Sequence, residues 1–221
     1  MKLNTSYLLL KPDKPVSCDA NKLRGYIGNQ FIEYPILHNH YNKEKYHYGY
    51  PLIQYKVING QAVILGINEG VEVLKDISSS IKKLKMDKYY FVNEKVFYEK
   101  EVNVSISRKE YQYQFMTPWI GLNTENYKKF IKIKNWKDKK IFLNKIIIGN
   151  ILSMCKGLGI IVNRQLRVKS YLNEKTVQYK SVNMKGFAGE FTVNFRMPTL
   201  FGLGKGVSQG FGTVKIISDG E

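Results

Sequence analysis

The sequence predicts an α+β protein built from two tandem βαββαβ units, of which the second is distorted. The clearest signal is Asn59-Gly60, which separates two apolar runs at 50–58 and 61–67. Asn-Gly between apolar runs is typical of a tight β-hairpin. An apolar stripe at helical spacing precedes the hairpin, a second stripe follows it, and a strand-like run lies at each outer end. The resulting order, strand-helix-hairpin-helix-strand, is the ferredoxin-like pattern.

The first half supplies one complete unit. A short strand is expected at 7–10, and Ser17 or Asp19 can cap the helix that follows. Asn68 can cap the second helix, and a final strand is expected within 88–100. The apolar positions at helical spacing are Ala20, Leu23, Ile27 and Phe31 in the first helix and Leu74, Ile77, Ile81 and Leu84 in the second. Gly25 and Gly28 weaken the first helix, since each costs about 1 kcal/mol relative to alanine.

The second half is less regular and predicts the distorted unit. Strands are expected at 102–107 and 111–115 around a turn, followed by a lysine-rich stretch and a helix from Asp138 to Cys155 that stops at Gly157. Four strand-like pieces complete it, at 160–168, 175–182, 190–196 and 212–218. The boundary is expected near Lys100, which divides the chain into domains 1–100 and 101–221.

Charge points to a polyanionic partner. The chain has 35 Lys and Arg against 18 Asp and Glu, a net charge of +17 with a pI of about 9.7. The excess is +5 in residues 1–100 and +12 in residues 101–221, so the second half is the better candidate for binding a polyanion. Nucleic acid and an anionic membrane are the two partners that such charge favours, and a generic basic protein is the alternative.

Targeting and redox signals are sparse. No run approaches the roughly 20 apolar residues of a membrane span, no amphipathic basic helix favours binding to a membrane surface, and the N-terminal segment lacks a signal-peptide cleavage pattern. We therefore expect a cytoplasmic protein without a membrane partner. Cys18 and Cys155 are expected as free thiols, and no Cys-x-x-Cys pair supports a thiolate zinc site.

A glycine-rich segment lies near the C-terminus, where residues 201–214 read FGLGKGVSQGFGTV. Glycine permits a positive φ and close approach of another chain, and the exposed amides of such a loop can bind phosphate. The segment matches neither the Walker A motif nor the dinucleotide fingerprint, because no Gly-Lys-Ser/Thr occurs and Val207 stands where that fingerprint needs glycine. A nucleotide cofactor is therefore not expected.

The spacing of these glycines resembles the signature loop of the Cas6 family of CRISPR repeat-processing endoribonucleases. Gly202-Leu203-Gly204, five residues and Gly210-Phe211-Gly212 reproduce its pattern, with Lys205 as the basic residue within it. In the first half, KLRGYIGNQF, LHNHY, YGYPLIQYKVI and ILGINEG are similar to the Cas6b branch in particular. The resemblance implies two ferredoxin-like domains and a ribonuclease that needs no cofactor.

All three histidines of the chain, His38, His40 and His47, lie in one polar, tyrosine-rich stretch. One hypothesis is a metal site, since His38 and His40 would face the same side of an extended segment, but the spacing to His47 or Glu44 matches no known ligand set. A second is acid/base catalysis, because imidazole exchanges protons near neutral pH. A third is that these are surface histidines without a role. We expect no metal.

The resemblance implies that a histidine activates the 2′-OH of RNA for attack on the adjacent phosphorus. The implied cleavage leaves mature crRNA with 2′,3′-cyclic phosphate and 5′-OH ends. His40 is the first candidate for this role and His38 the second. The tyrosine of such a site is assigned to Tyr48, with Tyr41, Tyr46 and Tyr50 as competitors. Its lysine stays open between Lys45 and Lys56.

The RNA contacts that the resemblance and the basic residues suggest are Lys22, Arg24, Gly204, Lys205, Gly206, Ser208, Gln209, Arg164 and Arg167. The lysines of 128–140 could bind RNA or form a solvated face. The expected partner is CRISPR repeat RNA (pre-crRNA), with other Cas proteins of an interference complex as further partners and a homodimer among the open oligomeric states. The alternative function is a non-catalytic RNA-binding subunit of such a complex.

Overall fold

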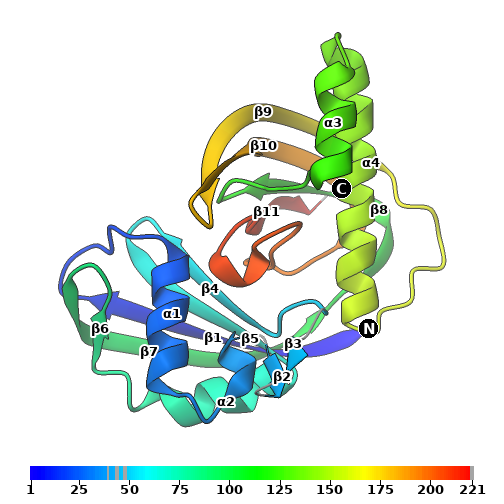
Figure 1. Ribbon diagram of the computed structural model, residues 1–221. Coiled ribbons are helices and arrows are strands. Elements are labelled where there is room, and N and C mark those ends of the chain that lie inside the picture. The colour runs from blue at the N-terminus through cyan, green and yellow to red at the C-terminus, as the bar shows by residue number, and fades with distance from the viewer. Residues whose placement is uncertain (39, 43–44, 47–48, 220–221) are drawn as a thin grey trace. The chain divides into compact units, whose positions relative to one another are not determined.

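The chain folds into two compact units, each with its own antiparallel sheet (Figure 1). The computed structural model describes residues 1–38, 40–42, 45–46 and 49–219, the two short ranges by their backbone alone. One unit comprises 2–102 together with 207–210, and the rest of the described chain forms the other. A four-residue segment from near the C-terminus is therefore packed into the first unit.

The first unit has a five-stranded sheet in the order β4-β5-β1-β7-β6. Its strands are β1 (Lys2–Pro12), β4 (Ile53–Ile58), β5 (Gln61–Ile67), β6 (Lys83–Lys85) and β7 (Tyr89–Asn103). The strand β1 pairs antiparallel with β5, and β5 pairs antiparallel with β4. Without β6, which forms a hairpin with β7, the order β4-β5-β1-β7 is that of a ferredoxin-like unit, as predicted.

Two helices, α1 (Ala20–Gln30) and α2 (Glu69–Ser78), complete the βαββαβ order. Their predicted apolar stripes are buried in one core with residues of β1, β4 and β5, among them Leu8, Leu10, Leu23, Ile27, Ile53, Tyr55, Ile64, Leu74 and Ile77. Three details differ from the prediction. The side chain of Asp19, a predicted cap of α1, makes no capping hydrogen bond. Asn68 has φ +49° and its side chain does not cap α2. Ile81 and Leu84 are buried beyond the helix end, because the chain turns into β6 there.

The turn between β4 and β5 has the predicted hairpin conformation. Asn59 and Gly60 both have positive φ, +51° and +77°, as the two central residues of a type I′ turn require. Asparagine and glycine tolerate this region better than other residues. The local sequence therefore fixes the register in which Ile58 pairs with Gln61 and Tyr55 with Ile64.

The second unit repeats the same strand order with one helix position altered. Its sheet runs β11-β8-β10-β9, formed by β8 (Ser105–Phe115), β9 (Val168–Tyr179), β10 (Val182–Arg196) and β11 (Val214–Asp219). The first crossover contains α3 (Thr124–Lys132) and α4 (Trp136–Gly157). Residues 197–213 occupy the second crossover, where a short 3-10 helix, η2 (Val207–Gln209), replaces the usual α-helix. This replacement is the distortion that the sequence predicted.

Several boundaries in this unit differ from the prediction. The predicted strand at 102–107 spans the end of β7 and the start of β8, and the one at 175–182 spans the turn between β9 and β10. The strand β8 is continuous, and the polar run expected as a turn lies at a register shift opposite Val193 and Phe195 of β10. Residues 160–167 form no strand. Asn194 of β10 binds two of their backbone groups: its Oδ1 accepts from the Arg167 amide at 2.7 Å and its Nδ2 donates to the Gln165 carbonyl at 3.0 Å. Helix α4 starts at Trp136, capped by Asn135.

Aromatic rings fill the core of the second unit. The Trp119 ring is stacked on Phe115 with centroids 5.5 Å apart, and Phe191 lies 5.1 Å from Phe115. Helix α4 adds the buried side chains Leu143, Ile147 and Ile151. Of the helices in the described ranges, none combines the length and apolarity that crossing a membrane would require.

Candidate functional site

The end of a short 3-10 helix, η1 (Pro35–His38), is held by two side chains from different elements. The hydroxyl of Tyr55 on β4 donates to the Leu37 carbonyl at 3.1 Å, and Nη2 of Arg24 on α1 donates to the His38 carbonyl at 2.6 Å. Burial raises the pKa of the Tyr55 hydroxyl, so it remains a neutral donor. The entry to the histidine segment is thereby fixed to both α1 and β4.

The imidazole of His38 packs against α1 at Gly28. A Cβ atom at position 28 would overlap Cε1 and Nε2 of His38 and lie 2.8 Å from its Cδ2. The His38 side chain is half-buried. The helical glycine, which costs stability by its intrinsic propensity, thus provides the space in which this ring lies.

His40 is the first residue of β2 (His40–Asn42), where it is the Cα partner of Tyr46 in β3 (Lys45–Tyr46). The described structure gives this hairpin by its backbone alone. Tyr48, the predicted catalytic tyrosine, and His47 lie outside the described residues. Tyr50, one of its competitors, is buried. The two candidate histidines therefore belong to successive short elements, η1 and β2, between α1 and β4.

Lys56, one of the two candidate lysines, is fully buried on β4. Its Nζ donates to Oε1 of Gln54 at 3.0 Å, and Nε2 of Gln54 donates to the Pro51 carbonyl at 3.2 Å. Burial lowers the pKa of Lys56 to about 7, because the charged form is poorly solvated there. Lys56 is therefore a core residue and not a surface cation.

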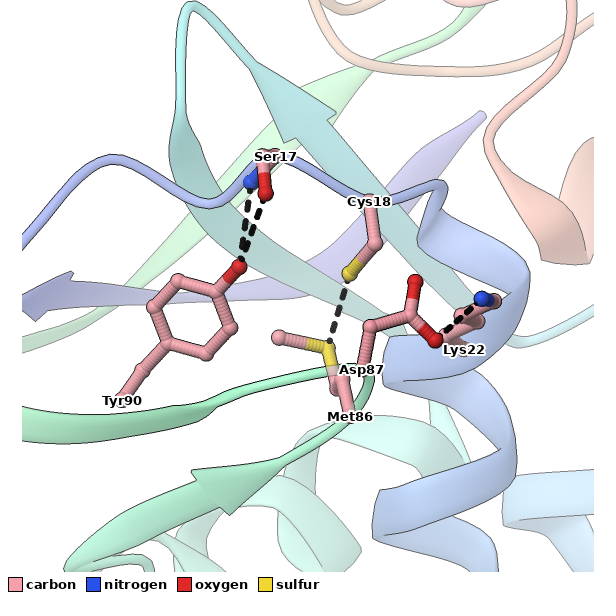
Figure 2. Close-up of polar contacts among 6 residues, drawn as sticks. All are labelled: Ser17, Cys18, Lys22, Met86, Asp87 and Tyr90. Carbon is pink, nitrogen blue, oxygen red and sulfur yellow. Dashed lines mark hydrogen bonds and ion pairs between the residues drawn. The ribbon is translucent and has the colours of Figure 1, made fainter.

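The two basic residues predicted on α1 make contacts within the first unit. Figure 2 shows Lys22 paired with Asp87, which lies between β6 and β7, beside the contacts of Ser17 with Tyr90 and of Cys18 with Met86. The guanidinium of Arg24 binds the His38 carbonyl, as described above. The structure thus assigns Arg24 a positioning contact that the sequence did not reveal. Both cysteines are free thiols, as predicted.

The residues predicted in the glycine-rich loop are divided between the two units. Gly204, Lys205 and Gly206 belong to the second, where the Lys205 amide donates to the Ile120 carbonyl at 2.9 Å. The Lys205 ammonium lies 5.1 Å from the centre of the Tyr179 ring. Ser208 and Gln209 form η2 in the first unit, packed against α1 and β4. The predicted phosphate contacts of the loop are therefore shared between the two units and stay a prediction.

The remaining basic candidates lie on the second unit. Arg164 and Arg167 are exposed on the irregular segment between α4 and β9. In the lysine-rich stretch, Lys139 pairs with Glu174 of β9 at 3.3 Å, and the Lys140 ammonium lies 3.8 Å from the centre of the Tyr171 ring. These two lysines therefore link α4 to β9 of the sheet.

A metal centre is not visible among the described side chains: no three His, Cys, Asp or Glu residues within them come together as they would around an ion. The histidine stretch lies largely outside that description. The absence of a metal at the histidines stays a prediction.

Two ferredoxin-like units with a glycine-rich loop before the last strand are the architecture that the Cas6 resemblance implied. Family models assign the two halves separately: residues 1–103 match the Cas6b N-terminal domain and residues 105–217 match the Cas6b C-terminal domain. The chain therefore belongs to the Cas6b family, as its motifs predicted.

Solved structures support the same assignment. The chain is similar to a protein described as Cas6b, with a TM-score of 0.91 and 34% identity over 98% of this chain and 100% of that one. A CRISPR RNA processing endoribonuclease Cas6b matches with a TM-score of 0.79 and 33% identity over the same shares. An uncharacterized protein of Methanocaldococcus jannaschii, MJ0978, is 43% identical over 104 residues, 47% of this chain and 70% of the relative.

Proposed function

We propose that this chain is a metal-independent endoribonuclease that cuts CRISPR precursor RNA within its repeats. Membership of the Cas6b family supports the substrate class, and a relative at 33% identity is described as a CRISPR RNA processing endoribonuclease. The observation that favours catalysis over binding alone is the fixed entry to the histidine segment, where Arg24 and Tyr55 bind the carbonyls of His38 and Leu37. A catalytic group needs such support to be held in a productive geometry.

In this proposal His40 takes the proton of the RNA 2′-OH, and the oxygen attacks the adjacent phosphorus. The new O2′–P bond forms as the P–O5′ bond breaks, and a second protonated group, His38 or Tyr48, gives a proton to the departing 5′ oxygen. The products are a 2′,3′-cyclic phosphate and a 5′-OH. Each proton-transfer group would contribute roughly 10²–10⁴-fold to the rate.

RNA binding is proposed to fall mainly on the second half, which has most of the net positive charge. Lys205 and the exposed Arg164 and Arg167 are the candidate phosphate contacts there. Lys22 and Arg24, together with Ser208 and Gln209, would add contacts from the first unit. The cleaved product would then stay bound for transfer to other Cas proteins.

The test is cleavage of a CRISPR repeat RNA in excess EDTA, run beside the same RNA with one 2′-deoxy sugar just upstream of the cut. Cleavage of the all-ribose RNA alone supports metal-independent attack by the 2′-OH. Cleavage that appears only after a divalent ion is added would contradict the proposal and indicate that the histidines bind a metal ion. Tight binding without cleavage of either RNA favours the second candidate, a non-catalytic RNA-binding subunit.

A further inference from the structure

A pocket of about 440 Å³ lies within the second unit, between the start of α3, the middle of α4 and the glycine-rich loop. Its size is within the range of roughly 300–1,000 Å³ that is usual for small-molecule sites. Its lining comprises Ile120, Gly121, Leu122, Asn123, Thr124, Asn126, Lys145, Ile146, Gly149, Asn150, Gly204 and Lys205. Apart from Gly204 and Lys205, none of these residues was a predicted site residue.

The lining combines cations, hydrogen-bond donors and an apolar wall. Lys145 of α4 and Lys205 of the loop bring two positive charges, and within the described part of the chain no carboxylate forms an ion pair with either. Asn150 accepts from Nε1 of Trp119 at 2.9 Å, which leaves its amide nitrogen as a donor. Ile146, half-buried on α4, supplies apolar surface, and the buried Ile120 and Leu122 also line the pocket.

The first turn of α3 adds backbone donors to the same space. The Asn123 side chain accepts from the Asn126 amide at 2.8 Å, and the amides of Thr124 and Glu125 have no acceptor within the helix. Such amides favour a phosphate group, as do the two lysines. An apolar wall beside phosphate-binding groups suits a base and its ribose.

We infer that this pocket binds one unpaired nucleotide of the RNA strand, with its phosphate toward the lysines and its base against the apolar wall. The inference rests on the proposed function, since it takes RNA as the partner, and it names a contact away from the bond that is cut. A free nucleoside monophosphate has the same phosphate, ribose and base, so the test must distinguish it from a nucleotide of the RNA strand.

Gly149 allows the pocket to be filled without removing a charge. A Cβ atom at this position would meet no other atom within 4 Å, and the residue is exposed on α4. Leucine is a good helix former, so Gly149→Leu should fold and should occupy part of the pocket. Gly149→Ala is the matched control, because it gives the same helix a methyl group that leaves most of the space open.

The RNA measurement uses a repeat RNA made uncleavable by a 2′-deoxy sugar at the cut, with its affinity followed by fluorescence anisotropy across a salt series. Gly149→Leu should weaken binding about fivefold, the lower end of what one bound base contributes, with little change in the salt slope. Lys145→Ala should weaken binding and reduce that slope by about 0.7, as loss of one phosphate contact requires. Gly149→Ala should bind like the wild type, and Lys156→Ala, on the last turn of α4, should change binding less than Lys145→Ala.

Wild-type affinity in both Gly149→Leu and Lys145→Ala would overturn the inference. A second measurement titrates AMP and UMP into the wild type and into Gly149→Leu by NMR. Monophosphate binding that Gly149→Leu abolishes, together with unchanged RNA affinity, would assign the pocket to a free nucleotide and overturn the RNA contact. If the wild type does not bind repeat RNA, the proposed function fails, and the monophosphates then decide separately whether the pocket is a nucleotide site.

Discussion

The imidazole of His38 occupies the space that the missing side chain of Gly28 leaves on α1. Ten residues separate the two in the sequence, and the backbone between them leaves the helix and turns back through η1. Arg24, one turn earlier on the same helix, binds the carbonyl of His38. One helix therefore contacts both the ring and the backbone of a candidate catalytic residue.

Gly28→Ala should lower cleavage at least tenfold although alanine is the better helix former. The added methyl group would overlap the His38 ring and displace it, and small displacements of catalytic groups have large effects on rate. Gly25→Ala is the matched control, since a Cβ atom there meets nothing within 4 Å. It should raise the free energy of unfolding by up to about 1 kcal/mol and leave single-turnover cleavage unchanged. Equal cleavage by the two variants would mean that the position of His38 does not matter.

Tyr55→Phe should reduce both stability and cleavage. The change leaves the Leu37 carbonyl without its donor, which should lower the free energy of unfolding by about 1–3 kcal/mol, and it releases one of the two groups that fix η1. Tyr90→Phe removes another buried tyrosine hydroxyl, bound to Ser17 (Figure 2), and should reduce stability with cleavage intact. The measurements are urea unfolding and single-turnover cleavage at saturating enzyme. Normal cleavage by Tyr55→Phe would show that η1 needs no such support.

His40→Ala should lower the cleavage rate by roughly 10²–10⁴-fold, as expected for a general base, with RNA affinity within about twofold of the wild type. His38→Ala, tested beside it, ranks the two histidines. The measurement pairs single-turnover cleavage with anisotropy on an uncleavable RNA. If rate and affinity fall together for His40→Ala, the residue supports binding or folding.

Lys205→Ala should weaken RNA binding and make it less dependent on salt. Each phosphate contact to a single strand contributes about 0.7 to the slope of log affinity against log salt. Lys205 also lies near the Tyr179 ring, so unfolding of the variant should be measured to show that the loop persists. An unchanged salt slope would exclude Lys205 from the RNA contacts.

The burial of Lys56 predicts that the free energy of unfolding depends on pH. The pKa of Lys56 is about 7 in the folded protein and 10.5 in its ordinary state. Between these values the unfolded chain binds a proton that the folded chain lacks, so the free energy of unfolding rises with pH, by up to about 1.4 kcal/mol per unit. Lys56→Met removes this term. Urea unfolding from pH 7 to 9 should therefore show a smaller rise for the variant than for the wild type, and parallel curves would mean that Lys56 is not buried as a neutral amine.

Local patterns explain what could be predicted. Three features could be recognised in the sequence: the hairpin at Asn59-Gly60, the apolar stripes of α1 and α2, and the glycine spacing of 202–212. Each depends on a few neighbouring residues. Helix α3 was not predicted because Phe130 is its single buried residue, so its lysine-rich sequence shows no apolar stripe. The polar run inside β8 is typical of a turn, and only its pairing with β10 shows that the strand continues.

The sequence by itself determined the βαββαβ order of the first unit, the Cas6b resemblance and the candidate histidines, because each of these depends on residue identity and spacing along the chain. The tertiary structure alone decided that Gly28 makes room for His38, that Lys56 is buried and that the glycine-rich loop contributes to both units. These relationships join residues that are distant in sequence or hidden from solvent. They follow from the packing of the helices on the sheets, and a local sequence pattern does not predict that packing.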